Sequence, residues 1–258
     1  MGREEHERAV RFRTARRDPE LTVVEGFHAL KHALRFGAEL VEAVATDPPA
    51  LEAMAADLAP DMAGRIGGQV ELVDKETLAD LVPLVPHTGV AAIARRPRVD
   101  PAAALAAPAP DPAVLLEDPR NMGNIGACIR VAAAAGAAGV FTTGENDPWH
   151  PDAVRGAAGL QFALPVAKVE SLPASDRPLL AIDPEGEELA PEEMPARAFL
   201  AFGTERHGLS GEVFERADAR ISIPMREGVS SLNLATSVAI VLFAIKLGPA
   251  EAPERRPE

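Results

Sequence analysis

Residues 220–247 read RISIPMREGVSSLNLATSVAIVLFAIKL, and the C-terminal half of the chain is interpreted outward from this stretch. A β-type run at 221–225 leads into a polar turn and then a long apolar helix with no charged residue before Lys246. Residues of the kind that cap helices stand at its start: Ser230, Ser231 and Asn233. One capping residue is enough for one helix end. The remaining polar groups therefore predict a ligand site where the helix begins.

Upstream of this stretch, apolar strand-like runs alternate with helical segments. The run AVLLED at 113–118 is almost continuously apolar, which is typical of a strand buried on both faces. Similar runs follow at 139–144, 164–169, 178–183 and 198–203. The alternation predicts a parallel α/β sheet covered by helices, with ligands bound beyond the carboxyl ends of its strands. Three loops are expected at that edge: 118–124, 203–208 and 225–233.

The N-terminal half shows a shorter alternation of the same kind, which predicts a small α/β domain. It is followed by RPRVDPAAALAAPAPDP at 96–112, and a segment so rich in Pro and Ala favours an extended connection. We expect five parts in chain order: a flexible basic arm at 1–17, a small α/β domain at 18–96, a linker at 97–112, a larger α/β domain at 113–248 and a disordered tail at 249–258.

Composition narrows the class of protein. The chain has 258 residues, a formal net charge of −13 and a single cysteine, Cys128. One cysteine excludes an internal disulfide framework and a Cys-based metal cluster, and Cys128 is interpreted as a small buried helix residue. No apolar run predicts export or a membrane span, so we expect a cytoplasmic protein. His28 and His32 lie one helical turn apart, but without a third ligand we interpret them as surface residues and expect no metal.

The first two loops carry the residues that suggest chemistry. DPRNMGNIGACIR places Asn124 near the start of a helix and Arg130 inside its apolar part. A guanidinium there needs a partner or a water-facing cleft, and a phosphate or the carboxylate of Glu205 would serve. FGTERHGLS places Glu205 after an apolar strand. Because these loops contain no nucleophile triad and no metal cluster, they predict a site for binding and orienting a substrate.

A dinucleotide-binding loop is the rival interpretation of Gly123 and Gly126. The full GxGxxG pattern is missing, and the next strand ends in Thr142, Thr143 and Gly144 without the acidic residue that binds a ribose. We therefore set aside a nicotinamide-dependent oxidoreductase.

Three runs resemble, in order and spacing, the motifs of the SpoU or TrmH-type RNA ribose methyltransferases. They are NIGACIR at 124–130, FGTERHGLS at 202–210 and ISIPMREGVSSLNLA at 221–235. The resemblance spans about 113–247. The preceding half, with VEGFHALKHAL and GVAAIARRP, resembles the ribosomal-protein-like RNA-recognition domain found ahead of the catalytic domain in many members.

This resemblance implies a trefoil-knotted SPOUT methyltransferase domain behind an RNA substrate-binding α/β domain. It also implies a homodimer formed through the C-terminal domain and S-adenosylmethionine as cofactor. The residues implied to hold the cofactor, mainly through backbone groups, are Gly203, Ile223, Met225 and Leu232.

Transfer of a methyl group to a ribose 2′-hydroxyl is the implied reaction, with Arg130 as the implied catalytic residue. A guanidinium is hard to deprotonate, so we interpret Arg130 as a clamp for the target phosphate that stabilises the developing alkoxide. Four residues would orient Arg130 and the nucleotide: Asn124, Glu205, Ser231 and Asn233.

Ribosomal RNA is the expected partner, because the N-terminal half resembles a ribosomal protein. A transfer RNA ribose methyltransferase and a non-catalytic, ribosome-associated RNA-binding module remain the alternatives. The negative net charge is unexpected for an RNA enzyme. We therefore predict a local positive track made by the arginines of the arm with Arg95, Arg96, Arg98, Arg120, Arg155, Arg206 and Arg226.

Overall fold

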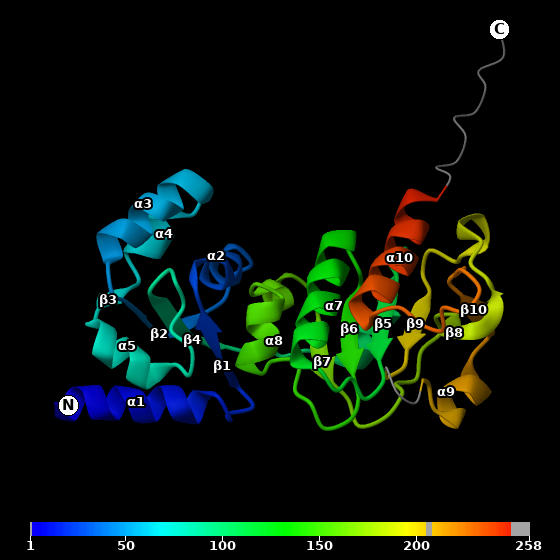
Figure 1. The fold of residues 1–258 in the computed structure, drawn as a ribbon, viewed down its shortest axis with the longest axis horizontal. Helices are drawn as coiled ribbons and strands as arrows, with labels where there is room; N and C mark the ends of the chain where they lie inside the picture. The colour runs from blue at the N-terminus through cyan, green and yellow to red at the C-terminus, as the bar shows by residue number, and fades with distance from the viewer. Residues whose placement is uncertain (1, 205–207, 249–258) are drawn as a thin grey trace, which may run out of the picture.

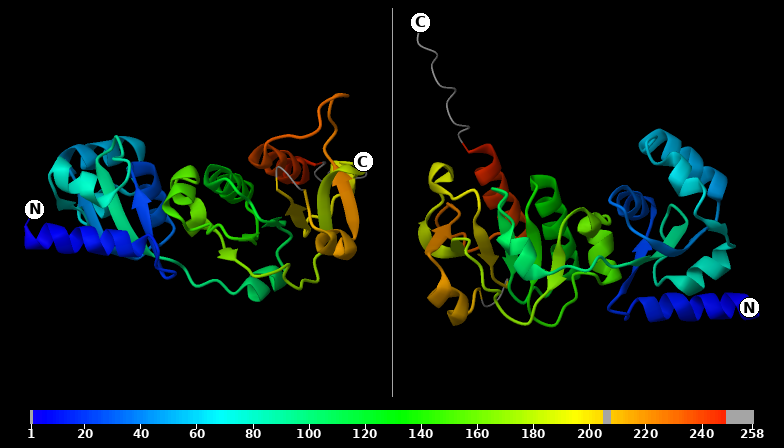
Figure 2. Two further views of the ribbon diagram at one scale, coloured as in Figure 1. Left: turned by 60° about the horizontal axis from the view of Figure 1, so that its bottom comes forward. Right: turned by 180° about the vertical axis from the view of Figure 1, so that it is seen from behind.

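The computed structural model describes residues 2–204 and 208–248, which form two α/β domains side by side along one long axis (Figure 1). Two further views show the same separation, with α8 on the side of the C-terminal domain that faces the N-terminal domain (Figure 2). Glu205 and the expected tail at 249–258 lie outside the described residues. None of the described helices has both the length and the apolar character needed to cross a membrane.

The C-terminal sheet has six strands in the order β10-β8-β9-β5-β6-β7, and every neighbouring pair is parallel. The strands are β5 (Ala113–Leu116), β6 (Gly139–Thr142), β7 (Val166–Lys168), β8 (Leu179–Glu188), β9 (Phe199–Phe202) and β10 (Ala219–Ser222). Leu116 at the end of β5 is in register with Phe202 on one side and Thr142 on the other. The predicted parallel sheet is confirmed, and its carboxyl ends share one edge.

Both faces of this sheet are buried because alternate residues of each strand enter different cores. Val114 and Leu116 pack with residues of α7, α8 and α10, whereas Ala113 and Leu115 pack with residues of α6 and α9. The helical segments are α6 (Pro101–Ala106), α7 (Met122–Ala135), α8 (Pro151–Gly156), η1 (Leu160–Ala163), η2 (Pro191–Glu193), α9 (Gly211–Arg216) and α10 (Leu234–Leu247). Two-sided burial explains why the strands are almost continuously apolar.

The N-terminal sheet has four strands in the order β1-β4-β2-β3, with β4 antiparallel to both neighbours. Its strands are β1 (Leu21–Glu25), β2 (Leu40–Ala45), β3 (Glu71–Leu72) and β4 (Val90–Arg95). One face packs against α2 (Phe27–Arg35), α3 (Pro48–Leu58) and α4 (Ala63–Gly67), and the other against α1 (Arg3–Ala15) and α5 (Lys75–Leu81). The predicted small α/β domain is therefore present, as a mixed sheet covered by helices on both faces.

The expected flexible arm is instead the ordered helix α1. Ala9, Phe12 and Ala15 are spaced to form one apolar stripe, and all three are buried in the core beneath the sheet. Arg8 is also buried and donates to Glu42 at 2.7 Å. The prediction of a flexible arm is wrong, because the many charged residues of this segment made its short apolar stripe difficult to recognise from the sequence.

The expected extended linker also contains a helix. Asp100 caps α6 by accepting from the Ala102 N–H at 3.0 Å, and Leu105 is buried against the C-terminal sheet. Its Pro101 occupies the first helical turn, where a missing N–H is tolerated. The connection between the domains is therefore partly packed rather than fully extended.

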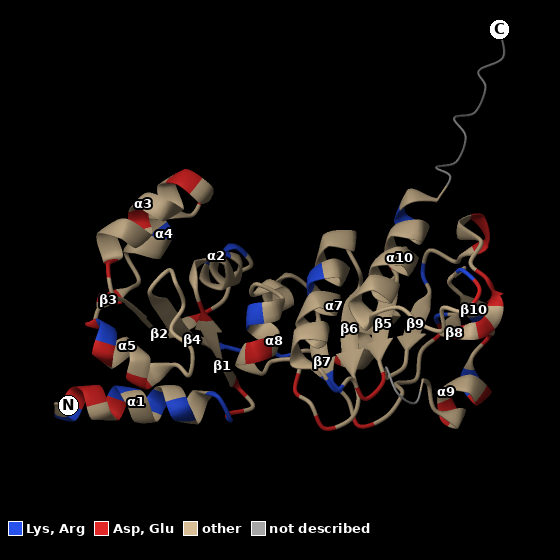
Figure 3. Cartoon of the chain, viewed as in Figure 1, with Lys and Arg blue, Asp and Glu red and all other residues tan. Residues whose placement is uncertain are grey.

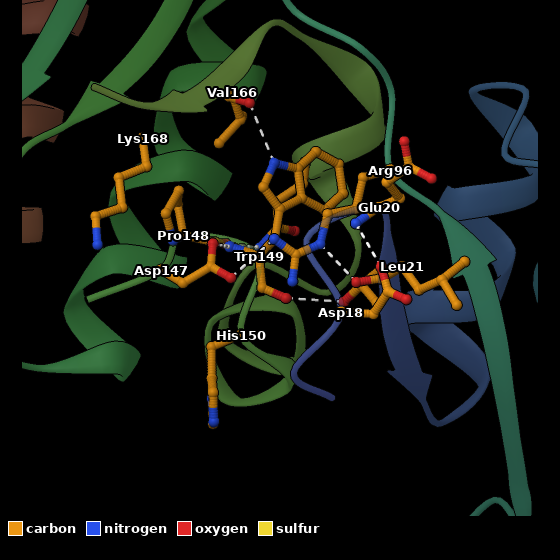
Figure 4. Close-up of polar contacts among 12 residues, drawn as sticks. Asp18, Glu20, Leu21, Arg96, Asp147, Pro148, Trp149, His150, Val166 and Lys168 are labelled. Carbon is orange, nitrogen blue, oxygen red and sulfur yellow. Dashed lines mark hydrogen bonds and ion pairs between the residues drawn. The ribbon is translucent and has the colours of Figure 1, made fainter. Parts of the chain in front are cut away.

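Polar contacts join the domains where β1 meets the segment before α8 (Figure 4). Arg96 donates to the Leu21 carbonyl in its own domain and to Asp147 in the other, the latter at 2.8 Å. The buried Trp149 donates its indole N–H to the Val166 carbonyl at 3.1 Å. One hydrophobic cluster also runs through both domains. The junction is thus a packed interface.

Glu25 is the buried charge at this junction, with a side chain only 1% exposed. It forms ion pairs with Arg16, which follows α1, and with Arg155 of α8, the second at 2.6 Å. Thr22 on the same strand donates to the Trp149 carbonyl at 2.8 Å. The strand β1 therefore forms both an ion pair and a neutral hydrogen bond with the C-terminal domain.

Candidate active site

A cavity of about 220 Å³ lies beyond the carboxyl end of β9, beside residues 182–184 of β8 and against the start of α10. Its lining includes all four residues expected to hold a cofactor: Gly203, Ile223, Met225 and Leu232. The structure brings these residues together from the second and third predicted loops and, for Ile223, from the residue that follows β10, because parallel strands end at the same edge. We call this hollow the knot-loop cavity, because its loops are those that the family resemblance implies to be knotted.

Glycines shape one wall of the knot-loop cavity. Thr204 and Gly208 bond to each other in both directions, N–H to carbonyl, at 3.1 Å. A Cβ atom on Gly203 would overlap the backbone of Gly208, and Gly208 itself has a φ of +64°. Gly203 and Gly208 therefore present no side chain to the cavity, and a ligand at these two positions meets backbone.

Asn233 links the third loop to the first. Its Oδ1 accepts from the Ala235 N–H at 2.9 Å and so caps α10, while its Nδ2 donates to Asn124 Oδ1 at 3.1 Å. Ser231 does not cap the helix and lines the knot-loop cavity instead. The capping interpretation therefore holds for one residue, and Asn124, Ser231 and Asn233 lie at one edge of the sheet.

Arg130 lies elsewhere. It is exposed on α7 and has no hydrogen bond or ion pair with any residue in 2–204 or 208–248. Six residues separate it from Asn124, which is about 9 Å along the helix and about 240° around it. Instead of the knot-loop cavity it lines a second cavity at the domain junction. Its suggested pairing with Glu205 falls outside the described residues.

Two acidic residues at this edge were not identified from the sequence. Asp183 lines the knot-loop cavity and pairs with Arg220 at 2.6 Å, and this hydrogen bond raises the pKa of Arg220 above its ordinary value. Glu117 accepts from the Ser210 N–H at 2.7 Å and from its hydroxyl at 2.6 Å. Glu117 follows an apolar strand run and Asp183 ends one, and this position at a strand end is the sequence signal that could have identified them.

The glycines of the first motif have a packing role. A Cβ atom on Gly126 would overlap the carbonyl oxygen of Ala153, so α7 and α8 approach each other closely here. Cys128 is buried on the same helix, as expected. In the described ranges no three His, Cys, Asp or Glu side chains form a metal site, and His32 bonds to the Ala158 carbonyl at 2.7 Å.

Ion pairs neutralise most arginines of the predicted positive track. Arg95 pairs with Glu39 and Arg96 with Asp147, both at 2.8 Å. The same holds for Arg8, Arg11, Arg16, Arg98, Arg120 and Arg155. Figure 3 shows this interleaving of basic and acidic residues along α1. The track as predicted is wrong for these residues, because each guanidinium faces a carboxylate; Arg206 lies outside the described residues.

Comparison with known proteins identifies the family. The profile of the SpoU rRNA Methylase family matches residues 111–243, which is half of the chain. The chain belongs to the SpoU family. A second profile, RNA 2'-O ribose methyltransferase substrate binding, matches residues 23–99 of this SpoU protein.

Relatives of this SpoU protein include a 23S rRNA (adenosine(1067)-2'-O)-methyltransferase of Streptomyces azureus, 28% identical over 88% of this chain and 87% of the relative. An uncharacterized tRNA/rRNA methyltransferase of Synechocystis is 32% identical, but the match spans only about half of either protein. The crystal structure of an AdoMet-bound rRNA methyltransferase from Sinorhizobium meliloti has 25% identity and a TM-score of 0.74 and covers 95% of both chains. The predicted family, the mixed α/β fold with a parallel-sheet domain, and the enzyme class, an RNA 2′-O-methyltransferase, are confirmed.

Proposed function

We propose that this SpoU protein transfers a methyl group from S-adenosylmethionine to a ribose 2′-hydroxyl of ribosomal RNA. The observation that carries the proposal is the contact of Asn124 with Asn233 beside a cavity lined by Gly203, Ile223 and Leu232. The names of the Streptomyces azureus and Sinorhizobium meliloti proteins support ribosomal RNA as the substrate.

The knot-loop cavity suits S-adenosylmethionine. Its wall at Gly203 leaves no room for a Cβ atom, so backbone groups are within reach of a planar adenosine. Ile223, Met225 and Leu232 supply apolar surface to the cavity. When bound, the cofactor supplies a methyl group made electrophilic by its sulfonium.

The protein side chains then have to position the ribose and help its hydroxyl lose a proton. We assign the phosphate clamp and the stabilisation of the developing alkoxide to Arg130. This guanidinium has no acidic partner in the described part of the chain, so it is free to bind a phosphate. Asn124, Ser231 and Asn233 orient the nucleotide, and Glu205 is proposed for the same task.

A homodimer through the C-terminal domain, with the trefoil knot of the family, completes the proposal. Arg130 faces the domain junction and Ser231 faces the knot-loop cavity, so one chain does not place both on a single ligand. A second copy would bring its Arg130 to the first copy's cavity. Each active site would then use residues of two chains.

Methyl transfer from labelled S-adenosylmethionine to protein-free 23S ribosomal RNA tests the function. Arg130→Ala should lower transfer by about a hundredfold or more while cofactor affinity, measured by calorimetry, stays unchanged. Lys75→Ala, which removes an exposed cation on the N-terminal domain, is the matched control. Transfer by Arg130→Ala at the rate of the unmodified protein would remove Arg130 from the mechanism.

Mixing two inactive variants tests the shared site. Gly203→Val should block the knot-loop cavity and Arg130→Ala should remove the clamp, so each is inactive alone. Random mixing gives mixed dimers in half of the population, each with one intact site, and should restore about a quarter of the activity. No recovery, in a mixture shown to exchange subunits, would contradict a site built from two chains.

The same assays distinguish the two alternative functions from the proposed one. A non-catalytic RNA-binding module would bind ribosomal RNA without binding S-adenosylmethionine. A transfer RNA methyltransferase would label unfractionated transfer RNA and leave ribosomal RNA unlabelled.

A further inference from the structure

The cavity at the domain junction is larger than the knot-loop cavity, about 730 Å³, and we call it the junction cavity. Its N-terminal side is formed by the start of α2 and by residues 84–88, and its C-terminal side by Arg130, Arg155 and Ala158. Pockets that hold small organic ligands span roughly 300–1,000 Å³. The junction cavity is therefore large enough for one nucleotide.

Charge sets the junction cavity apart from its surroundings. Arg130 and Lys31 both line it, and neither forms an ion pair within residues 2–204 and 208–248. The acidic lining residue, Glu25, is already bound to Arg16 and Arg155. In a chain with a net charge of −13, where most predicted track arginines face carboxylates, this is a local positive site.

Burial strengthens the case for Lys31. Desolvation, and after it the neighbouring charge of Arg35, lower the pKa of Lys31 below its ordinary value. The charge of Asp61 acts in the opposite direction but more weakly, and the Lys31 ammonium, which forms no ion pair among the described residues, gains from an incoming phosphate. The Lys31 Nζ also lies 6.0 Å from the centre of the Phe27 ring.

The same cavity presents apolar and ring surface to solvent. Leu84 and Val85 are exposed by 65% and 42%, although both are large apolar residues. His87 is exposed beside them, and His28, at the start of α2, is also exposed. The loop is held to α2, because Thr88 Oγ1 accepts from the Phe27 N–H at 2.9 Å. A flat base can pack against such surface whatever its sequence.

We propose that the junction cavity binds one unpaired nucleotide of the RNA, next to the nucleotide that is methylated. Its base packs against the loop at 84–88 and His28, and its phosphate lies between Lys31 and Arg130. Because Arg130 also clamps the phosphate at the reacting ribose, the cavity sets which nucleotide reaches the methyl group. This inference rests on the proposed function for the identity of the polymer and for the role of Arg130.

Binding is tested on the full chain with a short single-stranded oligoribonucleotide that carries a photoreactive uridine. Cross-linking followed by peptide mass spectrometry should place adducts on residues 84–88 or on the peptide containing His28. The same sequence in a duplex should cross-link at least tenfold less. Adducts confined to other surfaces, or equal yields from duplex and single strand, would overturn the proposal.

Two matched pairs of variants separate the cavity from general charge and surface effects. Lys31→Glu should weaken binding of the oligoribonucleotide about tenfold and lower the salt slope by about one, whereas Lys75→Glu should change affinity less than twofold. Leu84→Ser should weaken binding several-fold, whereas Leu72→Ser, at a residue exposed by 66%, should not. Equal effects within either pair would contradict a local site.

The outcomes distinguish this inference from the proposed function. If the unmodified protein transfers methyl groups, but Lys31→Glu and Leu84→Ser bind the oligoribonucleotide as tightly as their control variants do, the nucleotide site in the junction cavity is refuted and the proposed function stands. Cross-links in the junction cavity without methyl transfer to any RNA would refute the enzyme and keep the nucleotide site.

Discussion

Asn233 has two separable tasks, and two substitutions can tell them apart. Its Oδ1 caps α10, and its Nδ2 donates to Asn124 at 3.1 Å. Asn233→Ser keeps a capping oxygen but is too short to reach Asn124, whereas Asn233→Ala loses both contacts. Loss of an N-cap costs about 1 kcal/mol, and loss of this exposed hydrogen bond about 0.5–1 kcal/mol. The free energy of unfolding should therefore fall by about 1.5–2 kcal/mol for Ala and about 0.5–1 kcal/mol for Ser.

The rate of methyl transfer should not follow the order of the two variants in stability. If the bond to Asn124 orients the nucleotide, Ser and Ala should both lower kcat by roughly 10- to 100-fold, because misplacement by a fraction of an ångström weakens transfer. Urea unfolding gives the stability, and transfer of labelled methyl to ribosomal RNA gives the rate. Asp74→Ala is the control, since it removes the cap that accepts from the Thr77 N–H at 2.7 Å in the other domain. It should lower stability by about 1 kcal/mol and leave kcat unchanged.

The reasoning fails if Asn233→Ser transfers methyl at the rate of the unmodified protein while Asn233→Ala does not. Asn233 would then act through the helix cap alone, and its contact with Asn124 would have no part in catalysis.

Other predictions concern the junction and the helix packing. Glu25→Gln should lower the free energy of unfolding by about 2–4 kcal/mol, since breaking a buried ion pair leaves Arg16 without a partner, and differential scanning calorimetry checks this. Gly126→Ala should destabilise by about 1–3 kcal/mol because its Cβ overlaps Ala153, while Gly64→Ala, which meets no neighbour, should not; urea unfolding compares them. Burial lowers the pKa of His32 below its ordinary 6.5, so the stability it contributes is complete above pH 6.5 and is lost as pH falls through the lower folded pKa. The urea midpoint should therefore decline below pH 6.5 and decline less in His32→Gln.

Much of the site was accessible from the sequence because a parallel sheet gathers strand ends at one edge. Gly203, Ile223, Met225 and Leu232 line a single cavity, although up to 29 residues separate them along the chain. Asn124 and Asn233 meet across 109 residues. The parallel strand direction predicted that the loops share one edge of the sheet, whereas the choice of these four cofactor residues came from the family resemblance.

What the sequence could not provide depends on side-chain direction and on partners distant in the chain. Arg130 follows Asn124 closely, but its helical phase turns it toward the domain junction rather than the knot-loop cavity. The arginines of α1 read as a basic arm because Glu42, which neutralises Arg8 and Arg11, lies more than 30 residues away. Charge counted along a sequence does not show which charges are already paired.

The packed junction between the domains limits which arginines of this acidic protein are available to bind RNA. Glu25 binds Arg155 across the interface, and Arg96 binds Asp147, so these cations hold the domains together instead of meeting a polyanion. A junction built this way, with one apolar cluster running through it, resists opening. The distance across the junction between Lys31 and Arg130 is then set by the protein, and the RNA has to adapt to it. Selectivity under the proposed function would follow from which RNA segment can present an unpaired nucleotide to Arg130 and Lys31 at that spacing.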